Sequence, residues 1–175
     1  MLGLSCARAL PLDEVMARLA QTQRRNATFV EEKHLAALDQ VLRSTGRLSY
    51  TRPAHLEKVT VAPQPENLVV DGDRLIINSA QDAPRVVELD DQPEIRAVVD
   101  TIRDALSGNL AGLQQQYDVA GSGSLDDWSL VLHPRTPLLA KQVREVRIAG
   151  GADVRSIETV QTNGDTDRLT ITPAP

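Results

Sequence analysis

Residues 46–85 read GRLSYTRPAHLEKVTVAPQPENLVVDGDRLIINSAQDAPR, and this stretch decides the fold. The dipeptide Asp71-Gly72 lies between two apolar runs, 68–70 and 74–78, which is typical of a β-hairpin turn. Prolines 53, 63 and 65 interrupt the pattern where strands must end or lie at an edge, because proline has no N–H to donate. The stretch is predicted to be an antiparallel meander with one face to bury.

One face of this meander carries a charge among apolar side chains. Because side chains alternate along a strand, Leu48, Tyr50 and Arg52 share one face. Arginine keeps its charge and requires acceptors such as helix-end carbonyls, a carboxylate or a ligand headgroup. Two interpretations follow: Arg52 points outward or caps a turn, or it lies on the concave side and holds a lid helix until cargo enters.

Helices are predicted on both sides of the meander. Residues 13–23 have helical apolar spacing, and they are followed by a strand at 28–35. Residues 36–42 continue that strand or form an edge segment, and 44–46 are expected to turn into the next one. The apolar stripe after residue 91, between Pro93 and Gly108, predicts the clearest helix. Its stripe includes Ile95, Val98, Val99 and Ile102.

The remaining chain adds a short helix at 110–116 and strands at 117–120, 128–133, 142–148, 154–161 and 168–172. A long antiparallel sheet of this size curls on itself. The predicted fold class is α+β, mostly antiparallel β. The sheet is expected to form an incomplete, half-open β-barrel of about 10–11 strands. Helices are expected to cover its concave apolar face.

Composition restricts the function. The 175 residues suffice for one domain with a core, and the net charge of −5, without a Lys/Arg-rich run, argues against nucleic acid. Aromatic residues are only 2%, so a core or pocket must be lined mostly by Leu, Val and Ile. No apolar run approaches a membrane span, which predicts transient membrane contact only.

Residues 1–9 resemble the end of a secretory signal. They are small and apolar, and Ala7-Arg8-Ala9 has the form of a signal-peptidase site. An ordinary N-terminus is the alternative, and a lipoprotein anchor at Cys6 fits less well. We expect 1–9 to be a signal remnant, 10–175 to be one domain, and the location to be the periplasm.

Catalytic and metal-binding patterns are missing from the sequence. His34, His55 and His133 are dispersed, without carboxylates or cysteines at ligand spacing, so no metal site is predicted. There is no G-x-S-x-G, P-loop or G-x-G-x-x-G motif. The sequence therefore predicts a protein that is not an enzyme and has no cofactor.

The order of motifs resembles the LolA family of periplasmic lipoprotein carriers over residues 12–172. The motifs are a helix, a strand with Phe29, Gly46-x-Leu48-x-Tyr50-x-Arg52-Pro53, Asp71-Gly72, a helical insert and Leu130-x-Leu132-x-Pro134. A LolA-related branch is more similar still, through His55-Leu56-Glu57-Lys58 and Trp128-x-Leu130. Lys58 departs from the lipoprotein carriers, which usually have a cavity tryptophan there.

The resemblance implies a lid of helices over an apolar cavity for acyl chains, with Arg52 bonded to the lid. The ligand-binding residues expected for cavity and lid are Arg52, Leu48, Tyr50, Leu56, Phe29, Ile95, Val98, Val99 and Ile102. The implied partners are an acylated lipoprotein or lipid cargo, an inner-membrane exporter and an outer-membrane acceptor. The alternative for the apolar stripe of the helix after Pro93 is that it packs in a filled core, with no cavity beneath it.

Two functions compete. The first is a periplasmic carrier or chaperone that moves an acylated cargo toward the outer membrane. The second is a lipid- or lipoprotein-sensing regulatory binding protein of the envelope, since LolA-like folds also occur in such regulators. Those regulators usually have a second domain, and 175 residues hold one, so we expect the carrier.

Overall fold

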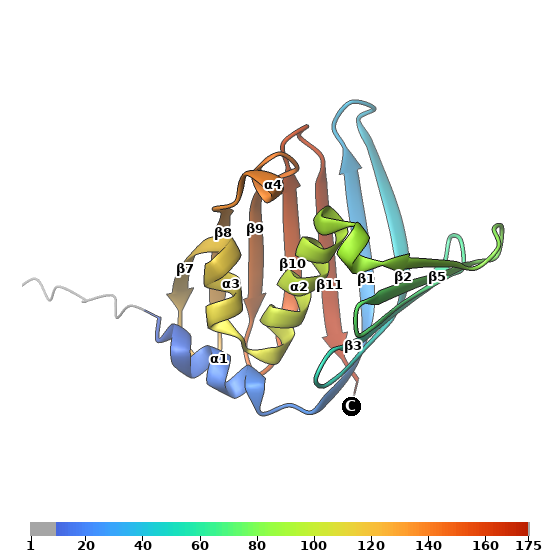
Figure 1. The fold of residues 1–175 in the computed structure, drawn as a ribbon. Coiled ribbons are helices and arrows are strands. Elements are labelled where there is room, and N and C mark those ends of the chain that lie inside the picture. Colours follow the sequence, from blue (N-terminus) through green and yellow to red (C-terminus); the bar gives the residue numbers. More distant parts are fainter. Residues whose placement is uncertain (1–9, 175) are drawn as a thin grey trace, which may run out of the picture.

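The computed structural model describes residues 10–174, so the predicted signal remnant at 1–9 lies outside the described residues. One antiparallel sheet has the strand order β6-β5-β4-β3-β2-β1-β11-β10-β9-β8-β7. Its strands are β1 (Arg24–Leu35), β2 (Gln40–Thr51), β3 (His55–Ala62), β4 (Glu66–Asp71), β5 (Arg74–Ser79), β6 (Arg85–Glu88), β7 (Tyr117–Gly123), β8 (Trp128–Pro134), β9 (Val143–Gly150), β10 (Val154–Gln161) and β11 (Thr166–Pro173). In the described chain the edge strands β6 and β7 do not pair, which confirms the predicted half-open barrel (Figure 1).

Helices line the concave side of the sheet. They are α1 (Leu12–Ala20), α2 (Pro93–Ser107), α3 (Leu110–Gln116) and α4 (Pro137–Ala140), and the 3₁₀ turn η1 (Leu89–Asp91) leads into α2. Figure 1 shows α2 and α3 across the concave face, with α1 below them and α4 at the upper end. None of the helices in the described residues has the length and apolar character of a membrane span.

The ends of α2 follow from its sequence. Pro93 occupies the first turn, where a missing N–H costs nothing. Gly108 ends the helix with φ 70°, and its N–H donates to the carbonyl of Asp104. A Cβ at Gly108 would also collide with the carbonyl oxygen of Met16 in α1. Glycine therefore ends α2 and lets α1 pack against that end.

The hairpin of β1 and β2 is longer than the sequence predicts. Residues 36–39 form the turn, and β2 starts at Gln40. The predicted turn at 44–46 is wrong, because Gly46 lies inside β2 and pairs with Phe29 of β1. A Cβ at Gly46 would collide with the carbonyl oxygen of Val59 and lie 2.8 Å from Cε1 of Phe29. Glycine is needed here for close approach and not for a turn.

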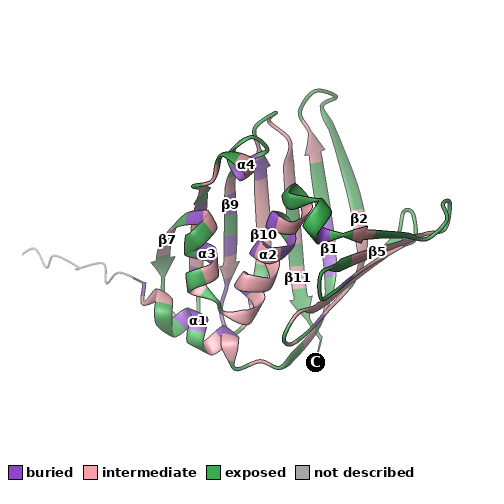
Figure 2. Ribbon diagram, in the orientation of Figure 1, coloured by how far each residue is buried: buried purple, intermediate pink, exposed green. Residues whose placement is uncertain are grey.

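The hydrophobic core is divided into two clusters. The larger joins α1, α3, α4 and one side of α2 to β7–β10, and it includes Leu113, Leu132 and Ile148. The smaller, formed by Val70, Leu89 and Val99, joins α2 and η1 to the β4 region. Figure 2 shows buried residues concentrated on the helices and the β7–β10 side, while most of β5 is only partly buried and much of the upper β1–β2 hairpin is exposed. Between the two clusters, the sheet and α2 are separated.

Candidate functional site

A cavity of about 560 Å³ lies between α2 and the inner face of the sheet. This volume is within the range of small-molecule and cofactor sites. Its wall comes from β1–β4 on one side and from β9–β11 on the other, with α2 as the cover. A second hollow, of about 290 Å³, lies at the turn between β3 and β4 and is lined by short or polar side chains. The larger cavity is the candidate site because two core clusters and a helix shape it.

Aliphatic side chains make up most of the cavity wall. On the sheet they include Leu48, Leu56, Leu68, Val70, Leu75, Val146, Ile157, Leu169 and Ile171, and on α2 they are Ile95, Val98, Val99, Ile102 and Leu106. Such a wall offers contacts to hydrocarbon and few polar partners. It suits an extended apolar group.

Two hydroxyl groups fix α2 to the far wall. Thr101 Oγ1 lies 2.9 Å from the hydroxyl of Tyr117, and it also donates to the carbonyl of Ala97 at 2.7 Å. Burial raises the pKa of Tyr117, and the hydrogen bond with Thr101 partly opposes this. The phenol is therefore neutral, and the pair closes this side of the cavity without a charge.

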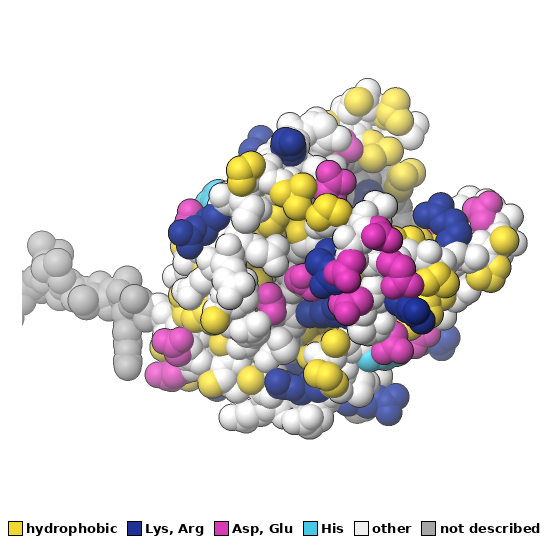
Figure 3. Space-filling model, in the orientation of Figure 1, with side chains coloured by type: hydrophobic (Ala, Val, Ile, Leu, Met, Phe, Trp, Pro, Cys, Tyr) yellow, Lys and Arg dark blue, Asp and Glu magenta, His cyan; other side chains and the backbone are white. Residues whose placement is uncertain are grey.

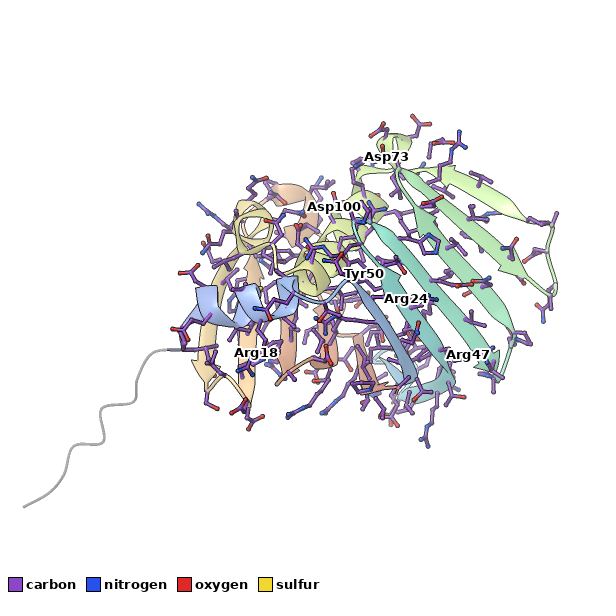
Figure 4. The ribbon with its side chains drawn as sticks, turned by 90° about the horizontal axis from the view of Figure 1, so that it is seen from below. Arg18, Arg24, Arg47, Tyr50, Asp73 and Asp100 are labelled. Atoms are coloured by element: carbon purple, nitrogen blue, oxygen red, sulfur yellow. The ribbon has the colours of Figure 1, made fainter. Side chains whose placement is uncertain are left out.

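The structure brings seven of the nine predicted site residues together on the cavity wall: Leu48, Tyr50, Leu56, Ile95, Val98, Val99 and Ile102. Val98 is 45% exposed, so it lies at the mouth. Figure 4 shows Tyr50 close to the helices, whereas Arg47 lies well away from them. That these residues bind a ligand stays a prediction.

Phe29 and Arg52 are placed differently from the other seven. Phe29 is buried in β1 and does not line the cavity, and Lys58 Nζ, which does, lies 5.1 Å from the centre of its ring. Arg52 does not line the cavity. Strand β2 ends at Thr51, so alternation no longer directs the side chain of Arg52 inward.

Arg52 is bound to a helix, and that helix is α1. The guanidinium of Arg52 donates to the carbonyl of Ala20, the last residue of α1. The backbone N–H of Arg52 donates to the carbonyl of Gln23 at 3.0 Å. A helix C-terminus leaves carbonyls without helical partners and attracts cations. The expected helix-end carbonyl is therefore present, but the contact holds α1 and not the helix over the cavity.

Two arginines of α2 hold this helix to the sheet. Arg103 Nε donates to the carbonyl of Ala54 at 3.1 Å, and its Nη2 donates to the carbonyl of Gly72. Arg96 Nη2 donates to Asp73 at 2.9 Å and to Asp90 at 2.6 Å. Figure 3 shows acidic and basic side chains gathered over this region of α2. The helix stripe could be found from sequence, but these partners depend on folded turns far away in the chain.

A cluster of charged and polar side chains interrupts the apolar wall. The polar cluster consists of Glu31, Lys33, Ser44, Lys58 and Asp167. Glu31 accepts from Lys58 Nζ at 2.6 Å and from Ser44 Oγ at 2.9 Å. Lys33 Nζ lies 3.4 Å from Asp167. The alternation of residues 28–35 could have placed Glu31 and Phe29 on one face, but the pairing with Lys58 requires the strand register.

The carboxylates of the cluster have opposite pKa shifts. Burial raises the pKa of Glu31, but the hydrogen bonds from Lys58 and Ser44 and the charges of both lysines outweigh it, so the pKa is lowered. Burial and the charge of Glu31 raise the pKa of Asp167, and Lys33 and Lys58 oppose this. Glu31 is thus held as a carboxylate against its burial.

A second ion pair lies at the lower end of the wall. Arg25 is paired with Asp153, and its Nη2 donates to the carbonyl of Leu19 at 3.0 Å. Both Arg25 and Asp153 border the cavity. The pair joins α1, β1 and the turn after β9, so it closes this end by electrostatic contacts.

These residues form an enclosed apolar space with charged groups at its border. Residues 10–174 contain no group of three His, Cys, Asp or Glu side chains that could hold a metal ion. The cavity can enclose hydrocarbon, and it is bordered by the ion pairs Lys58–Glu31 and Arg25–Asp153, which a polar head could approach.

Solved structures show the same fold. A LolA superfamily protein from Nitrosomonas europaea is 8% identical, with a TM-score of 0.48 over 92% of this chain and 91% of its own. A Vibrio parahaemolyticus domain, provisionally named an outer membrane lipoprotein-sorting protein, is 8% identical, with a TM-score of 0.50 over 94% and 90%. The Pseudomonas aeruginosa MucA/MucB complex has a chain that is 15% identical, with a TM-score of 0.50 over 92% of this chain and 55% of that one. At these identities the similarity concerns the fold alone.

The sequence itself gives the family. No curated protein sequence matches this chain significantly. A family model described as "Outer membrane lipoprotein carrier protein LolA-like" matches residues 4–174, which is nearly the whole sequence. The chain therefore belongs to the LolA-like family of outer membrane lipoprotein carrier proteins.

Proposed function

We propose that this protein is a periplasmic carrier that holds the acyl chain of a lipoprotein or lipid in the cavity under α2 and moves it toward the outer membrane. The observation that carries the proposal is the unfilled, largely aliphatic cavity between two core clusters. Family membership supports the same function. An inner-membrane exporter would supply the cargo, and an outer-membrane acceptor would take it.

The hydrophobic effect supplies the affinity. Each methylene moved from water into an apolar site contributes about 0.8 kcal/mol. The aliphatic wall formed by β2–β4, β9–β11 and α2 can cover such a chain on several sides. The wall has few hydrogen-bonding groups near the helix stripe. The affinity for a cargo therefore depends more on the length of its acyl chain than on the details of its shape.

Release is as important as binding for a carrier. The side of α2 that faces strands β3–β5 packs on a small core cluster of three buried residues. Its other contacts there include hydrogen bonds at the edge of the sheet, from Arg96 to the exposed Asp73 and from Arg103 to the partly buried carbonyl of Ala54. Such contacts exchange readily with water, so this side of α2 can separate from the sheet while the larger cluster stays packed.

Uptake and transfer of an acyl probe test the proposal. Purified protein should bind a fluorescent fatty acid with one-to-one stoichiometry and should speed its movement from donor to acceptor vesicles. Native mass spectrometry of protein purified from an envelope fraction should show bound lipid. A protein that is lipid-free and takes up no acyl probe would contradict the proposal.

A regulatory lipid-binding protein is the second candidate. The observation that favours it is the fold similarity, at a TM-score of 0.50, to a chain solved in complex with another protein, MucA/MucB, because a sensor would act through a protein partner. A regulator of this kind would bind the acyl probe and would not speed its transfer between vesicles. The vesicle measurement therefore separates the two candidates.

A further inference from the structure

The polar cluster contains two cations, Lys33 and Lys58. Lys58 is the one that lines the cavity. It lies on β3, directly opposite Leu48 of β2 and Leu68 of β4, which both line the apolar wall. Its side chain is 23% exposed. The ammonium group therefore lies at the boundary between aliphatic wall and charged wall.

The contacts of Lys58 fix the ammonium and leave part of it available. Nζ donates to Glu31 at 2.6 Å and lies 5.1 Å from the centre of the Phe29 ring. A lysine ammonium has three donors. Within residues 10–174, Glu31 is its one hydrogen-bond acceptor. Two donors are thus left for water or for a ligand in the cavity.

The carboxylates along the wall already have partners. Glu31 accepts from Lys58 and Ser44, and Asp167 is paired with Lys33 at 3.4 Å. Asp153 is paired with Arg25, and Glu57 accepts from Asn67 at 3.1 Å. Each of these carboxylates therefore already has a positively charged or hydrogen-bonding partner in the protein, and Lys58 has two donors left for an anionic group.

A hydrocarbon chain laid over the polar cluster would displace water from charged groups, which is costly. The aliphatic wall beneath α2 imposes no such cost. An amphiphile consequently gains most when its tail lies under α2 and its polar end lies against the cluster. The wall thereby orients the ligand.

We propose that Lys58 binds the anionic, oxygen-bearing head of an acyl ligand, a carboxylate or a phosphate, while the tail lies under α2. This inference rests on the proposed function, since it names the chemical class of ligand for the same cavity. Glu31 and Phe29 position the ammonium group of Lys58. An oxygen of the ligand head accepts hydrogen bonds from the N–H groups that Glu31 leaves free.

The test compares ligands that share one chain and differ in the head. Dodecanoate, dodecyl phosphate, dodecanol and dodecylamine are titrated at pH 8 against a bound fluorescent acyl probe. At least one anionic ligand should bind about tenfold or more tightly than dodecanol and dodecylamine, as expected for a hydrogen bond to a charged group. The stronger of the two anionic ligands identifies the head.

Variants assign this preference to Lys58. Lys58→Met should reduce the preference for the anionic head to less than about threefold, which is the loss expected when one charge-assisted hydrogen bond is removed. Lys58→Arg should retain the preference. Because Lys58→Met removes the nearest cation from the buried Glu31 carboxylate, the double variant Glu31→Gln/Lys58→Met is measured as well and should show the same loss. Arg47→Gln removes a cation from the exposed outer face of β2 and should change nothing.

The outcomes are distinguishable. Equal affinity for all four ligands, or a preference that survives in both Met variants, would overturn the role of Lys58 and leave the carrier function standing. Failure of every ligand to displace the probe, or failure of the probe to bind, would instead contradict the carrier function itself.

Discussion

Adding one methyl group at Gly46 should destabilise the folded protein. The Cα of Gly46 faces the carbonyl oxygen of Val59 and the ring of Phe29, so a Cβ has no space. We expect Gly46→Ala to lower the free energy of unfolding by about 2 kcal/mol, the usual cost of overpacking. Urea denaturation measures the change. Arg47→Ala, next in the strand and exposed, should change the free energy of unfolding by less than about 0.5 kcal/mol, and equal effects of both variants would contradict this account.

Glu31 should make stability depend on pH in a predictable direction. Its pKa in the folded protein is lowered, so the unfolded state binds more protons in this range and the stabilisation is present above the unfolded pKa of about 4.3. It is lost as the pH falls through the folded pKa. We expect the wild type to exceed Glu31→Gln in stability at pH 7, with the gap narrowing below about pH 5.

Thermal or urea unfolding from pH 7 to pH 3 measures this gap. Asp167 contributes with the opposite sign, since its raised pKa favours the protonated folded state at lower pH. The part of that contribution caused by burial is common to both proteins and cancels in the difference, whereas the part caused by the charge of Glu31 is absent from Glu31→Gln. Glu32→Gln, on the exposed face of the same strand, is the control. A gap that is constant with pH would show that Glu31 is not held as a carboxylate.

Helix α2 is fixed to the sheet through Arg103, whose side chain is 12% exposed. Removing two hydrogen bonds to the carbonyls of Ala54 and Gly72 should favour local opening. We expect Arg103→Ala to increase amide hydrogen exchange in α2 by about tenfold and to leave β1 and β2 unchanged. Mass spectrometry of exchanged peptides measures this. Arg144→Ala, at an exposed site on β9, should have no effect, and uniform acceleration in Arg103→Ala would indicate global destabilisation instead.

The apolar periodicity of the sequence predicts where the helices lie better than it predicts which residues they contact. The boundaries of α2 could be predicted because Pro93, the apolar stripe and Gly108 are local signals. The β1–β2 turn could not, because Gly46 has the residue type of a turn and is required by packing against Phe29. Arg52 was expected to hold the lid by resemblance, yet its carbonyl partner belongs to α1. Partners distant in sequence depend on the sheet register, which alternation within one strand does not contain.

The cavity is a property of the whole fold. Seven wall residues could be predicted, because alternation and helical spacing assign faces. That the space stays unfilled could not be predicted, because it depends on how far apart the two core clusters hold α2 and the sheet. The polar cluster likewise combines β1, β2, β3 and β11, which are far apart in the sequence.

Filling the cavity should remove ligand binding without unfolding the protein. Ala27 lies on the cavity wall, and its neighbour Thr28 is exposed on the other face of β1. We expect Ala27→Trp to weaken binding of a fluorescent fatty acid at least tenfold, because the indole occupies the space of the acyl chain. It should also lower the ligand-induced stabilisation, which is about 2.7 kcal/mol for a one-site ligand at 100 times its Kd, to about 1.4 kcal/mol or less at the same ligand concentration. Thr28→Trp adds the same side chain outside and should preserve both, so equal binding by the two variants would place the acyl site elsewhere.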